Sequence, residues 1–285
     1  MSAHADRQLD IRGLLQAAQL LLARRGASRL EAELLLASLL ECSREHLYAN
    51  PEAAVEPGLG SDFQLLLQQR LRGVPVAYLT GEKEFWSLPF MVSGDTLVPR
   101  PETELLVSTA LELLPVTGPA AVLDLGTGCG AIAIAIASER RETKVTAADV
   151  SGAALALAAR NAARHGLQNV CFLRSDWFAA LHGRRFHVIV GNPPYVDTAD
   201  PSLATGDISF EPRLALDGGH GGLQCIRSIV AAAGRHLHGD GVLLLEHGCD
   251  QGLLVRELFR LAGFQCVRTL ADLGGLERVT CGNWS

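Results

Sequence analysis

The sequence has 285 residues, of which 48% are hydrophobic and 20% charged, and its formal net charge is −6. That length allows one large or two modest domains, and the apolar share is ample for a buried core, which excludes a disordered chain. The negative charge provides no electrostatic footprint for bare nucleic acid, so no direct nucleic-acid partner is expected.

The cysteines and the N-terminal residues indicate the cellular compartment in which the protein is expected. The seven cysteines include no Cys-x-x-Cys pair, and their number is odd. A disulfide framework or a zinc site is therefore not expected, no metal ligand is assigned, and reduced thiols are typical of a cytoplasmic protein. The N-terminus lacks a basic start followed by an apolar run, and no apolar stretch reaches membrane-spanning length. We expect a soluble, cytoplasmic protein with no membrane partner.

Residues 1–73 are predicted to form a small helical bundle. The first helix should bury one apolar face, made of Ile11, Leu14, Leu15, Ala18, Leu21 and Leu22. Ser28 and Glu31 have the spacing of a capping box at the start of the next helix. Composition alone favours a stabilising appendage over a docking module for a macromolecular substrate.

Residues 74–98 change in character. The runs 74–81 and 84–90 have strand-like composition broken by Gly and Pro, which predicts a β-hairpin linker. The third part, residues 99–285, opens with two prolines that fix the entry to a helix over about 102–115. Arg100 lies between these prolines, so a positioned role in a site is a plausible alternative to an ordinary surface charge.

From residue 120 the sequence alternates between strand and helix patterns, which is typical of a parallel sheet. The expected order is strand 121–125, helix 131–139, strand 144–149, helix 152–165, strand 170–174, strand 188–190, helix 223–237, strand 241–246, helix 251–262 and strands 264–270 and 276–282. Helices on both faces of one sheet predict a doubly wound α/β domain, and the paired last strands predict an antiparallel finish.

A glycine-rich turn follows the first strand of this sheet, in the order Gly126, Thr127, Gly128, Cys129 and Gly130. Alternate glycines permit close backbone approach to a ligand, and the start of the following helix presents free N–H groups. The turn lacks the last gap of G-x-G-x-x-G, which counts against a dinucleotide site.

Two further residues at the ends of strands are candidates for nucleotide binding. Asp149 ends the second strand, where a carboxylate can accept both ribose hydroxyls of a ligand. Alternatively, Asp149 caps the helix that begins near Ser151. Trp177 follows the third strand and is a candidate to flank an adenine, although buried tryptophans more often belong to a core.

The run Asn192-Pro193-Pro194-Tyr195 follows a β-branched strand at 188–190. The two prolines stop any ladder or helix, so the run is held on a stiff loop at the carboxyl end of a buried strand. The Asn192 side-chain oxygen and the Pro193 carbonyl can each accept one proton of a substrate NH2 group. Tyr195 offers a flat face to a planar amide or base. A structural Pro-Pro turn is the alternative.

The segment 197–222, rich in Asp, Gly and Pro, is too long for a simple connection and is predicted to be a lid or a substrate clamp.

These motifs together resemble one family. The tetrapeptide at 192–195 is similar to the (Asn/Asp)-Pro-Pro-(Tyr/Phe) motif of methyltransferases that modify amide or exocyclic amino nitrogens. The full combination resembles the PrmC/HemK family of peptide chain release factor glutamine N5-methyltransferases, and it comprises Tyr78-Leu79-Thr80-Gly81, Glu84-Phe85-Trp86, Pro99-Arg100-Pro101-Glu102-Thr103-Glu104, Leu123-Asp124-Leu125-Gly126-Thr127-Gly128, Asn192-Pro193-Pro194-Tyr195, Phe210-Glu211-Pro212, Leu244-Leu245-Glu246-His247-Gly248 and Glu277-Arg278-Val279-Thr280.

The resemblance implies a Rossmann-like class I S-adenosyl-L-methionine-dependent methyltransferase domain preceded by a helical domain that docks a class 1 release factor. It implies cofactor contacts at Gly126, Thr127, Gly128, Cys129, Gly130, Asp149, Trp177 and Asn192. It implies a glutamine seat at Asn192, Pro193, Pro194 and Tyr195, in which Asn192, Pro193 and Tyr195 serve catalysis.

Other functions remain open from the sequence. The same chemistry fits a glutamine of a ribosomal protein or a DNA adenine, although the negative charge argues against DNA. A non-catalytic S-adenosylmethionine-binding adaptor is a further alternative, and the intact tetrapeptide at 192–195 argues against it.

Overall fold

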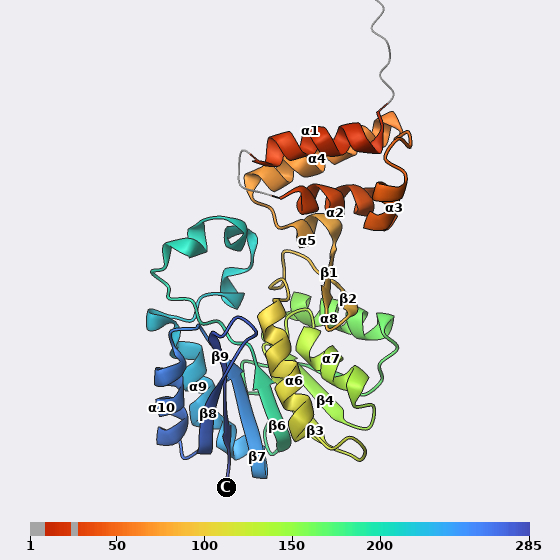
Figure 1. The fold of residues 1–285 in the computed structure, drawn as a ribbon. Helices are drawn as coiled ribbons and strands as arrows, with labels where there is room; N and C mark the ends of the chain where they lie inside the picture. The colour runs from red at the N-terminus through yellow and green to blue at the C-terminus, as the bar shows by residue number, and fades with distance from the viewer. Residues whose placement is uncertain (1–8, 24–27) are drawn as a thin grey trace, which may run out of the picture. The chain divides into compact units, whose positions relative to one another are not determined.

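The protein is described by a computed structural model that covers residues 9–23 and 28–285. The chain divides into two compact units, of which the first runs to Gly81 and the second runs from Glu82 to Ser285 (Figure 1). Each unit has its own hydrophobic core.

The first unit contains helices α1 (Ile11–Ala23), α2 (Arg29–Leu39), α3 (Arg44–Ala49), α4 (Pro57–Arg72) and α5 (Val76–Thr80). The apolar face predicted for α1 is buried in the core of this unit, except that Leu21 is 43% exposed. Phe63 and Leu67 of α4 face the same core. The expected helical bundle is thus confirmed.

Long-range ion pairs replace a predicted local contact in this unit. Ser28 is the N-cap of α2, but its side chain forms no capping hydrogen bond. The Glu31 carboxylate instead accepts a hydrogen bond from Arg70 of α4, over 2.6 Å. Glu33, which is buried and lies two residues further along α2, accepts hydrogen bonds from Arg44 and Tyr48. Charged groups therefore tie α2 to α3 and α4.

The prediction of a strand over residues 74–81 is wrong. Residues Val76–Thr80 form helix α5, which starts after Pro75 and packs against α2 and α4. The hairpin lies later, in β1 (Glu82–Phe85) and β2 (Leu88–Met91). Its two-residue turn, Trp86-Ser87, has positive φ at both positions, as hairpin turns that match the strand twist require. Tertiary packing outweighed the strand-like composition.

The second unit is built on a seven-stranded sheet in the order β5-β4-β3-β6-β7-β9-β8. The strands are β3 (Ala121–Leu125), β4 (Lys144–Asp149), β5 (Val170–Arg174), β6 (Phe186–Gly191), β7 (Leu237–Glu246), β8 (Gln265–Ala271) and β9 (Glu277–Asn283). Strands β3 to β7 run parallel, and β9 is antiparallel to both of its neighbours. The predicted α/β class with an antiparallel finish is confirmed.

Helices cover both faces of this sheet (Figure 1). One group consists of α6 (Glu104–Leu113), α7 (Ala131–Glu139) and α8 (Gly152–Arg164), and the other consists of α9 (Gln224–Ala233) and α10 (Gly252–Leu261). Right-handed crossovers explain why the helices divide between the two faces. From β3 the chain first adds β4 and β5 on one side of β3, and it then adds β6 and β7 on the other side, so the connecting helices fall on opposite faces. The strand order reverses between β3 and β6, and such a switch point is where open α/β sheets bind ligands.

The segment 197–222 is a chain of short 3-10 helices, η2 (Pro201–Ala204), η3 (Asp207–Phe210), η4 (Arg213–Ala215) and η5 (His220–Gly222). A bridge between Val196 and Asp217 ties its two ends together next to the end of β6. The smaller elements η1 (Pro101–Thr103) and η6 (Gly234–His236) precede α6 and β7.

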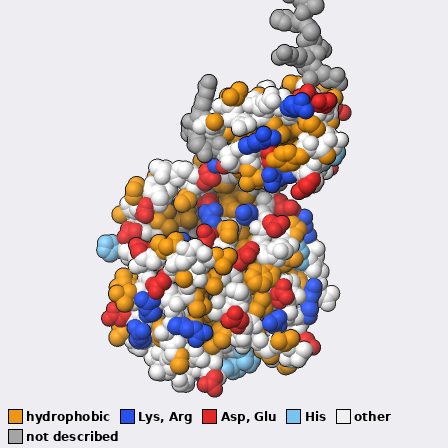
Figure 2. Space-filling model, in the orientation of Figure 1, with side chains coloured by type: hydrophobic (Ala, Val, Ile, Leu, Met, Phe, Trp, Pro, Cys, Tyr) orange, Lys and Arg blue, Asp and Glu red, His pale blue; other side chains and the backbone are white. Residues whose placement is uncertain are grey.

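The helices and the surface charge of the described residues were compared with those of membrane-spanning and nucleic-acid-binding proteins. None of the helices in the described residues is both long and apolar enough to cross a membrane. On the face drawn in Figure 2, acidic and basic side chains are interspersed, so that face carries no large patch of one charge.

Candidate functional site

The carboxyl ends of three adjacent strands bring the predicted site residues together. Leu125, the last residue of β3, pairs with Ala148 of β4 and with Gly191 of β6. The glycine turn at Gly126 and the residues Asp149 and Asn192 therefore follow at the same edge of the sheet. Segments that are far apart in the sequence meet because parallel strands share one direction.

A cavity of about 550 Å³ lies at this edge, within the usual size range of small-molecule sites. The predicted residues that line it are Gly126, Thr127, Gly128, Cys129, Asp149, Trp177, Asn192 and Pro194. Three other predicted residues, Gly130, Pro193 and Tyr195, do not line it.

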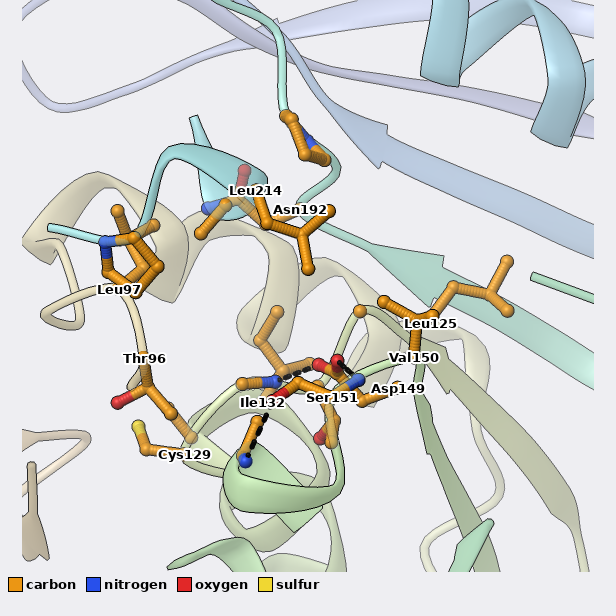
Figure 3. Close-up of a pocket in the computed structure, with 18 of the residues that line it drawn as sticks. Thr96, Leu97, Leu125, Cys129, Ile132, Asp149, Val150, Ser151, Asn192 and Leu214 are labelled. Carbon is orange, nitrogen blue, oxygen red and sulfur yellow. Dashed lines mark hydrogen bonds between the residues drawn. The ribbon is translucent and has the colours of Figure 1, made fainter. Parts of the chain in front are cut away.

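The polar side chains of Asn192 and Asp149 lie on opposite sides of the cavity. Figure 3 shows Asn192 and Leu214 on one side and Asp149 with Ser151 on the other. Thr96 and Leu97 lie on a further side, and they come from the segment between the hairpin and η1. Leu214 belongs to the predicted lid, so this segment supplies part of the wall.

The glycine turn serves both the cavity and the packing beneath it. Gly128 has a φ of +56°, and its backbone N–H donates to Asp149 Oδ2 over 2.9 Å. Gly130 has a φ of +88°, and a Cβ placed there would lie 2.9 Å from Ile134 Cδ1 and 3.1 Å from Ala158 Cβ. Gly130 is therefore required for the close packing of α7 on α8, which explains why it does not line the cavity.

Asp149 is held by backbone groups and keeps free acceptor capacity. Its two carboxylate oxygens accept from the N–H groups of Gly128 and Ser151, over 2.9 and 2.8 Å. Ser151 itself caps α8, because its hydroxyl accepts from Ala154 N. Asp149 is thus not the capping residue, and its remaining lone pairs are available to a ligand in the cavity.

Trp177 follows β5 in an unusual backbone conformation, with a φ of +44°. Its ring is half-buried and lines the cavity, and a Cβ added at Gly126 would lie 3.8 Å from Trp177 Cζ3. The Ser175 hydroxyl donates to the Trp177 carbonyl over 2.8 Å and supports this turn. The half-buried indole therefore lies beside the glycine turn and also packs against the edge of the core.

Asp124 is a buried carboxyl that the sequence motifs did not assign to the site. Thr127 Oγ1 donates to its Oδ2 over 2.6 Å, whereas Oδ1 is buried without a hydrogen-bond partner among the described residues. Burial raises the pKa of Asp124 to about 7, the Thr127 hydrogen bond opposes this, and the charge of Asp149 adds to it. In the sequence, this residue could have been recognised as the single acid within an otherwise apolar strand.

The Asn192 amide has a defined orientation. Its Nδ2 donates to the hydroxyl of Thr103 over 3.2 Å, and Thr103 is a buried residue of η1 that also lines the cavity. Because the NH2 end is engaged by Thr103, the Oδ1 end is left as an acceptor. The arrangement can therefore hold an N–H group of a ligand, as the sequence predicts.

Tyr195 points to a second buried carboxyl. Its hydroxyl donates to Glu246 Oε1 over 3.3 Å, and Glu246 ends β7 with 1% of its surface exposed. Burial raises the pKa of Glu246 to about 7, and hydrogen bonds from Thr103 and Tyr195 act in the opposite direction. Burial also raises the pKa of the Tyr195 hydroxyl, so that hydroxyl stays protonated and acts as a donor.

Arg100 joins the predicted lid to the wall of the cavity. Its guanidinium forms an ion pair with Glu211, whose other oxygen accepts from the backbone N–H of Val98 over 3.0 Å. Glu211 is buried, and Arg100 lines the cavity. The positioned role predicted for Arg100 thus includes anchoring the segment 197–222 close to the site.

Sequence reasoning missed Thr103, which lines the cavity. It also missed the buried acids Asp124 and Glu246, which do not line the cavity but accept hydrogen bonds from Thr127 and Tyr195. Thr103 gave no signal, because a threonine near the start of a helix is ordinary. Glu246, like Asp124, is an acid at or near the end of a strongly apolar strand, a position where an unneeded charge is costly.

Known proteins share both the sequence and the fold. Residues 13–81 match the PrmC N-terminal domain, and residues 86–209 match the methyltransferase small domain. The release factor glutamine methyltransferase of Pseudomonas aeruginosa is 53% identical over 259 residues, which cover 91% of this chain and 94% of that protein. The release factor glutamine methyltransferase of Escherichia coli is 46% identical over 256 residues, covering 90% and 92% of the two chains.

A solved structure supports the fold independently. The crystal structure of a methyltransferase from Pyrococcus furiosus is 21% identical to this chain, with a TM-score of 0.53, and the match covers 78% of this chain and 98% of that one.

Proposed function

The chain belongs to the family of release factor glutamine methyltransferases, and we propose that it methylates the side-chain amide nitrogen, N5, of a glutamine in class 1 peptide chain release factors. The glutamine is that of the Gly-Gly-Gln motif, and S-adenosylmethionine is the methyl donor. The observation that carries this proposal is the Asn192 amide, whose oxygen is left as an acceptor on the side of the cavity opposite Asp149.

The residues of the cavity fit S-adenosylmethionine. Asp149 has unused acceptor positions for ribose hydroxyls, because the backbone N–H groups of Gly128 and Ser151 occupy only one position on each oxygen. The half-buried Trp177 ring offers a flat face for the adenine. Asp124 does not line the cavity, but it supports the glycine turn from within the core, because its carboxyl accepts from the Thr127 hydroxyl over 2.6 Å.

The chemistry requires an acceptor arrangement rather than a strong base. When bound, S-adenosylmethionine supplies an electrophilic methyl group on a sulfonium sulfur. An amide nitrogen is a poor nucleophile, because its lone pair is delocalised into the carbonyl. The Asn192 oxygen and the Pro193 carbonyl would accept from the two N–H bonds of the glutamine and return electron density to its nitrogen. One of these two protons would leave to solvent as the nitrogen gains the methyl group and the sulfonium donor becomes a neutral thioether. Such positioning can supply up to roughly 7–11 kcal/mol of the barrier reduction.

The remaining residues of the tetrapeptide complete the glutamine seat. Pro193 is buried and Pro194 lines the cavity, so the two prolines fix the path of the backbone around the reacting nitrogen. Tyr195 would pack its ring beside the planar amide while its hydroxyl is held by Glu246.

The first unit is assigned to docking of the release factor. It has its own core and matches the N-terminal domain of the family, and none of its described residues lines the cavity. Leu30 and Leu34 lie one turn apart on α2 and are 45% and 38% exposed, so they offer an apolar stripe to a protein partner. The enzyme would act in the cytoplasm, on the free factor.

A panel of acceptors tests this function. Purified enzyme is incubated with isotopically labelled S-adenosylmethionine and, in separate reactions, a class 1 release factor, a ribosomal protein with exposed glutamines and duplex DNA. Label should enter only the release factor, and a release factor whose Gly-Gly-Gln glutamine is changed to alanine should stay unlabelled. Transfer to DNA or to the ribosomal protein, but not to release factor, would refute the substrate assignment.

A further inference from the structure

Leu214 is an apolar residue of the segment 197–222 that lines the cavity although most of its surface is exposed. It is 64% exposed to solvent. Figure 3 shows it on the same side of the cavity as Asn192, across from Asp149. A single exposed leucine is ordinary on a protein surface. Its meaning therefore depends on what it faces and on how firmly the backbone around it is held.

The backbone that carries Leu214 runs beside the glutamine seat. Val196, which follows the tetrapeptide, forms a parallel bridge with Asp217. Two backbone hydrogen bonds of 2.8 and 2.9 Å join Val196 to the residues on either side of Asp217. Pro193 and Leu214 each lie three residues before this bridge, on two chain segments that enter it in the same direction. Leu214 is thus placed next to the seat.

Two glycines that follow the bridge pack directly on the backbone of the seat. A Cβ at Gly218 would lie 2.7 Å from the Pro194 carbonyl oxygen and 2.7 Å from Tyr195 Cα. A Cβ at Gly222, whose φ is +68°, would lie 2.1 Å from the Tyr195 carbonyl oxygen. A side chain at either position would displace the seat, since the atoms in its way belong to the backbone. The segment is therefore fixed against the tetrapeptide on the C-terminal side of Leu214.

A buried carboxylate fixes the segment on the N-terminal side of Leu214. Glu211 is 5% exposed and forms an ion pair with the guanidinium of Arg100. Its other oxygen accepts from the backbone N–H of Val98 over 3.0 Å. Arg100 lines the cavity as well, so Glu211 ties the turn with Leu214 to a second wall of the cavity. Leu214 is held from both sides.

We propose that Leu214 is a specificity-determining residue, which limits the space before the target glutamine to a residue without a side chain. The proposal rests on the proposed function and deepens it. A glutamine whose amide reaches Asn192 leaves its own backbone at the mouth of the cavity, and the residue before it then passes Leu214. Glycine leaves room for the methyl groups of the leucine, whereas the Cβ of an alanine would meet them.

The fixed backbone gives this contact its selectivity. A leucine on a mobile loop would move aside for a larger residue, but the turn with Leu214 is anchored to the tetrapeptide and through Glu211 to Arg100 and Val98. The correct substrate covers the exposed leucine and gains apolar contact, while a larger residue is opposed by a clash. One extra methyl group in such a contact changes the efficiency of an enzyme about 10- to 200-fold.

Two forms of release factor and the full-length enzyme test the proposal. One form carries Gly-Gly-Gln, and in the other the second glycine is replaced by alanine. Leu214→Ala enlarges the mouth of the cavity, whereas Leu214→Met keeps a side chain of similar volume. Leu254→Ala is the matched control, because Leu254 is an exposed leucine of α10 that does not line the cavity. Val150→Ala removes an exposed apolar side chain from the side of Asp149.

We expect the wild-type kcat/KM to be about 10- to 200-fold higher for the Gly-Gly-Gln form than for the alanine form. Leu214→Ala should lower this ratio at least about fivefold, by raising kcat/KM for the alanine form. Leu214→Met, Leu254→Ala and Val150→Ala should keep the wild-type ratio. The Kd of Leu214→Ala for S-adenosylmethionine should stay within about twofold of wild type, because Leu214 lies on the side of the substrate.

Two results would overturn the proposal. One is a wild-type enzyme that methylates both forms with equal efficiency. The other is a Leu214→Ala enzyme that keeps the wild-type ratio, and a weakened affinity for S-adenosylmethionine in that variant would assign Leu214 to the donor instead. A wild-type enzyme that leaves the Gly-Gly-Gln form unmethylated would refute the proposed function itself.

Discussion

Replacement of Asp149 by alanine should weaken S-adenosylmethionine binding more than it weakens the fold. In the structure each Asp149 oxygen accepts one backbone N–H, from Gly128 or Ser151. A carboxylate offers about four lone-pair positions, which leaves two for the ribose hydroxyls of the donor. The alanine variant loses these hydrogen bonds and also loses an anchor of the glycine turn.

The size of this effect follows from the strength of hydrogen bonds to charged groups. Such a bond contributes about 1.5–3 kcal/mol, and the two ribose bonds share one carboxylate, so the loss should be on the order of one strong bond. That corresponds to a roughly 10- to 150-fold higher Kd. Asp149→Asn should show a similar loss, because its NH2 group would face the Gly128 or Ser151 N–H.

Titration calorimetry of the purified variants measures this directly. Asp176→Ala is the comparison, since Asp176 lines the same cavity but is exposed, and its carboxylate accepts from no backbone N–H among the described residues. If a general attraction between acids and a cationic ligand explained binding, both variants would lose affinity equally. Unchanged affinity in a folded Asp149→Ala protein would refute the ribose assignment.

Three further predictions concern the seat, the buried acid and the first unit. Asn192→Ala should lower kcat by about 10²-fold or more, as loss of a positioned polar group in an active site commonly does, with donor affinity and melting temperature little changed. Asp124 has a pKa raised to about 7, so its stabilising contribution is full below pH 4 and is lost as pH rises through 7. The difference in free energy of unfolding between Asp124→Asn and wild type, measured by denaturant titration, should therefore shift in favour of the variant by on the order of 3 kcal/mol from pH 5 to pH 8. The same difference at both pH values would contradict the raised pKa of Asp124. Leu30→Ser with Leu34→Ser should raise KM for release factor but not the Kd for the donor, whereas Leu254→Ser, an exposed leucine of α10, should change neither.

Much of the site could be predicted because its signals are local. The glycine turn, Asp149 and the Asn192 tetrapeptide each follow a buried strand, and residues at the carboxyl ends of parallel strands meet at one edge. Pattern alone thus placed three separate segments in one cavity.

The rest could not be predicted because it depends on contacts between distant residues. Thr103 becomes part of the seat only when η1 is packed over the end of β6, 89 residues later in the chain. Glu31 was expected to complete a local cap but pairs with Arg70, because α4 lies against α2. In the same way, the β-branched and aromatic run at 76–80 became helix α5 under the influence of its neighbours.

The central claim is tested most directly by locating the transferred methyl group. Release factor is treated with wild-type enzyme and S-adenosylmethionine, digested, and analysed by fragmentation mass spectrometry, with Asn192→Ala in parallel. We predict a single added methyl group on the side-chain nitrogen of the Gly-Gly-Gln glutamine, formed at a much lower rate by the variant. A methyl group on another residue type, or the same rate with Asn192→Ala, would contradict the account.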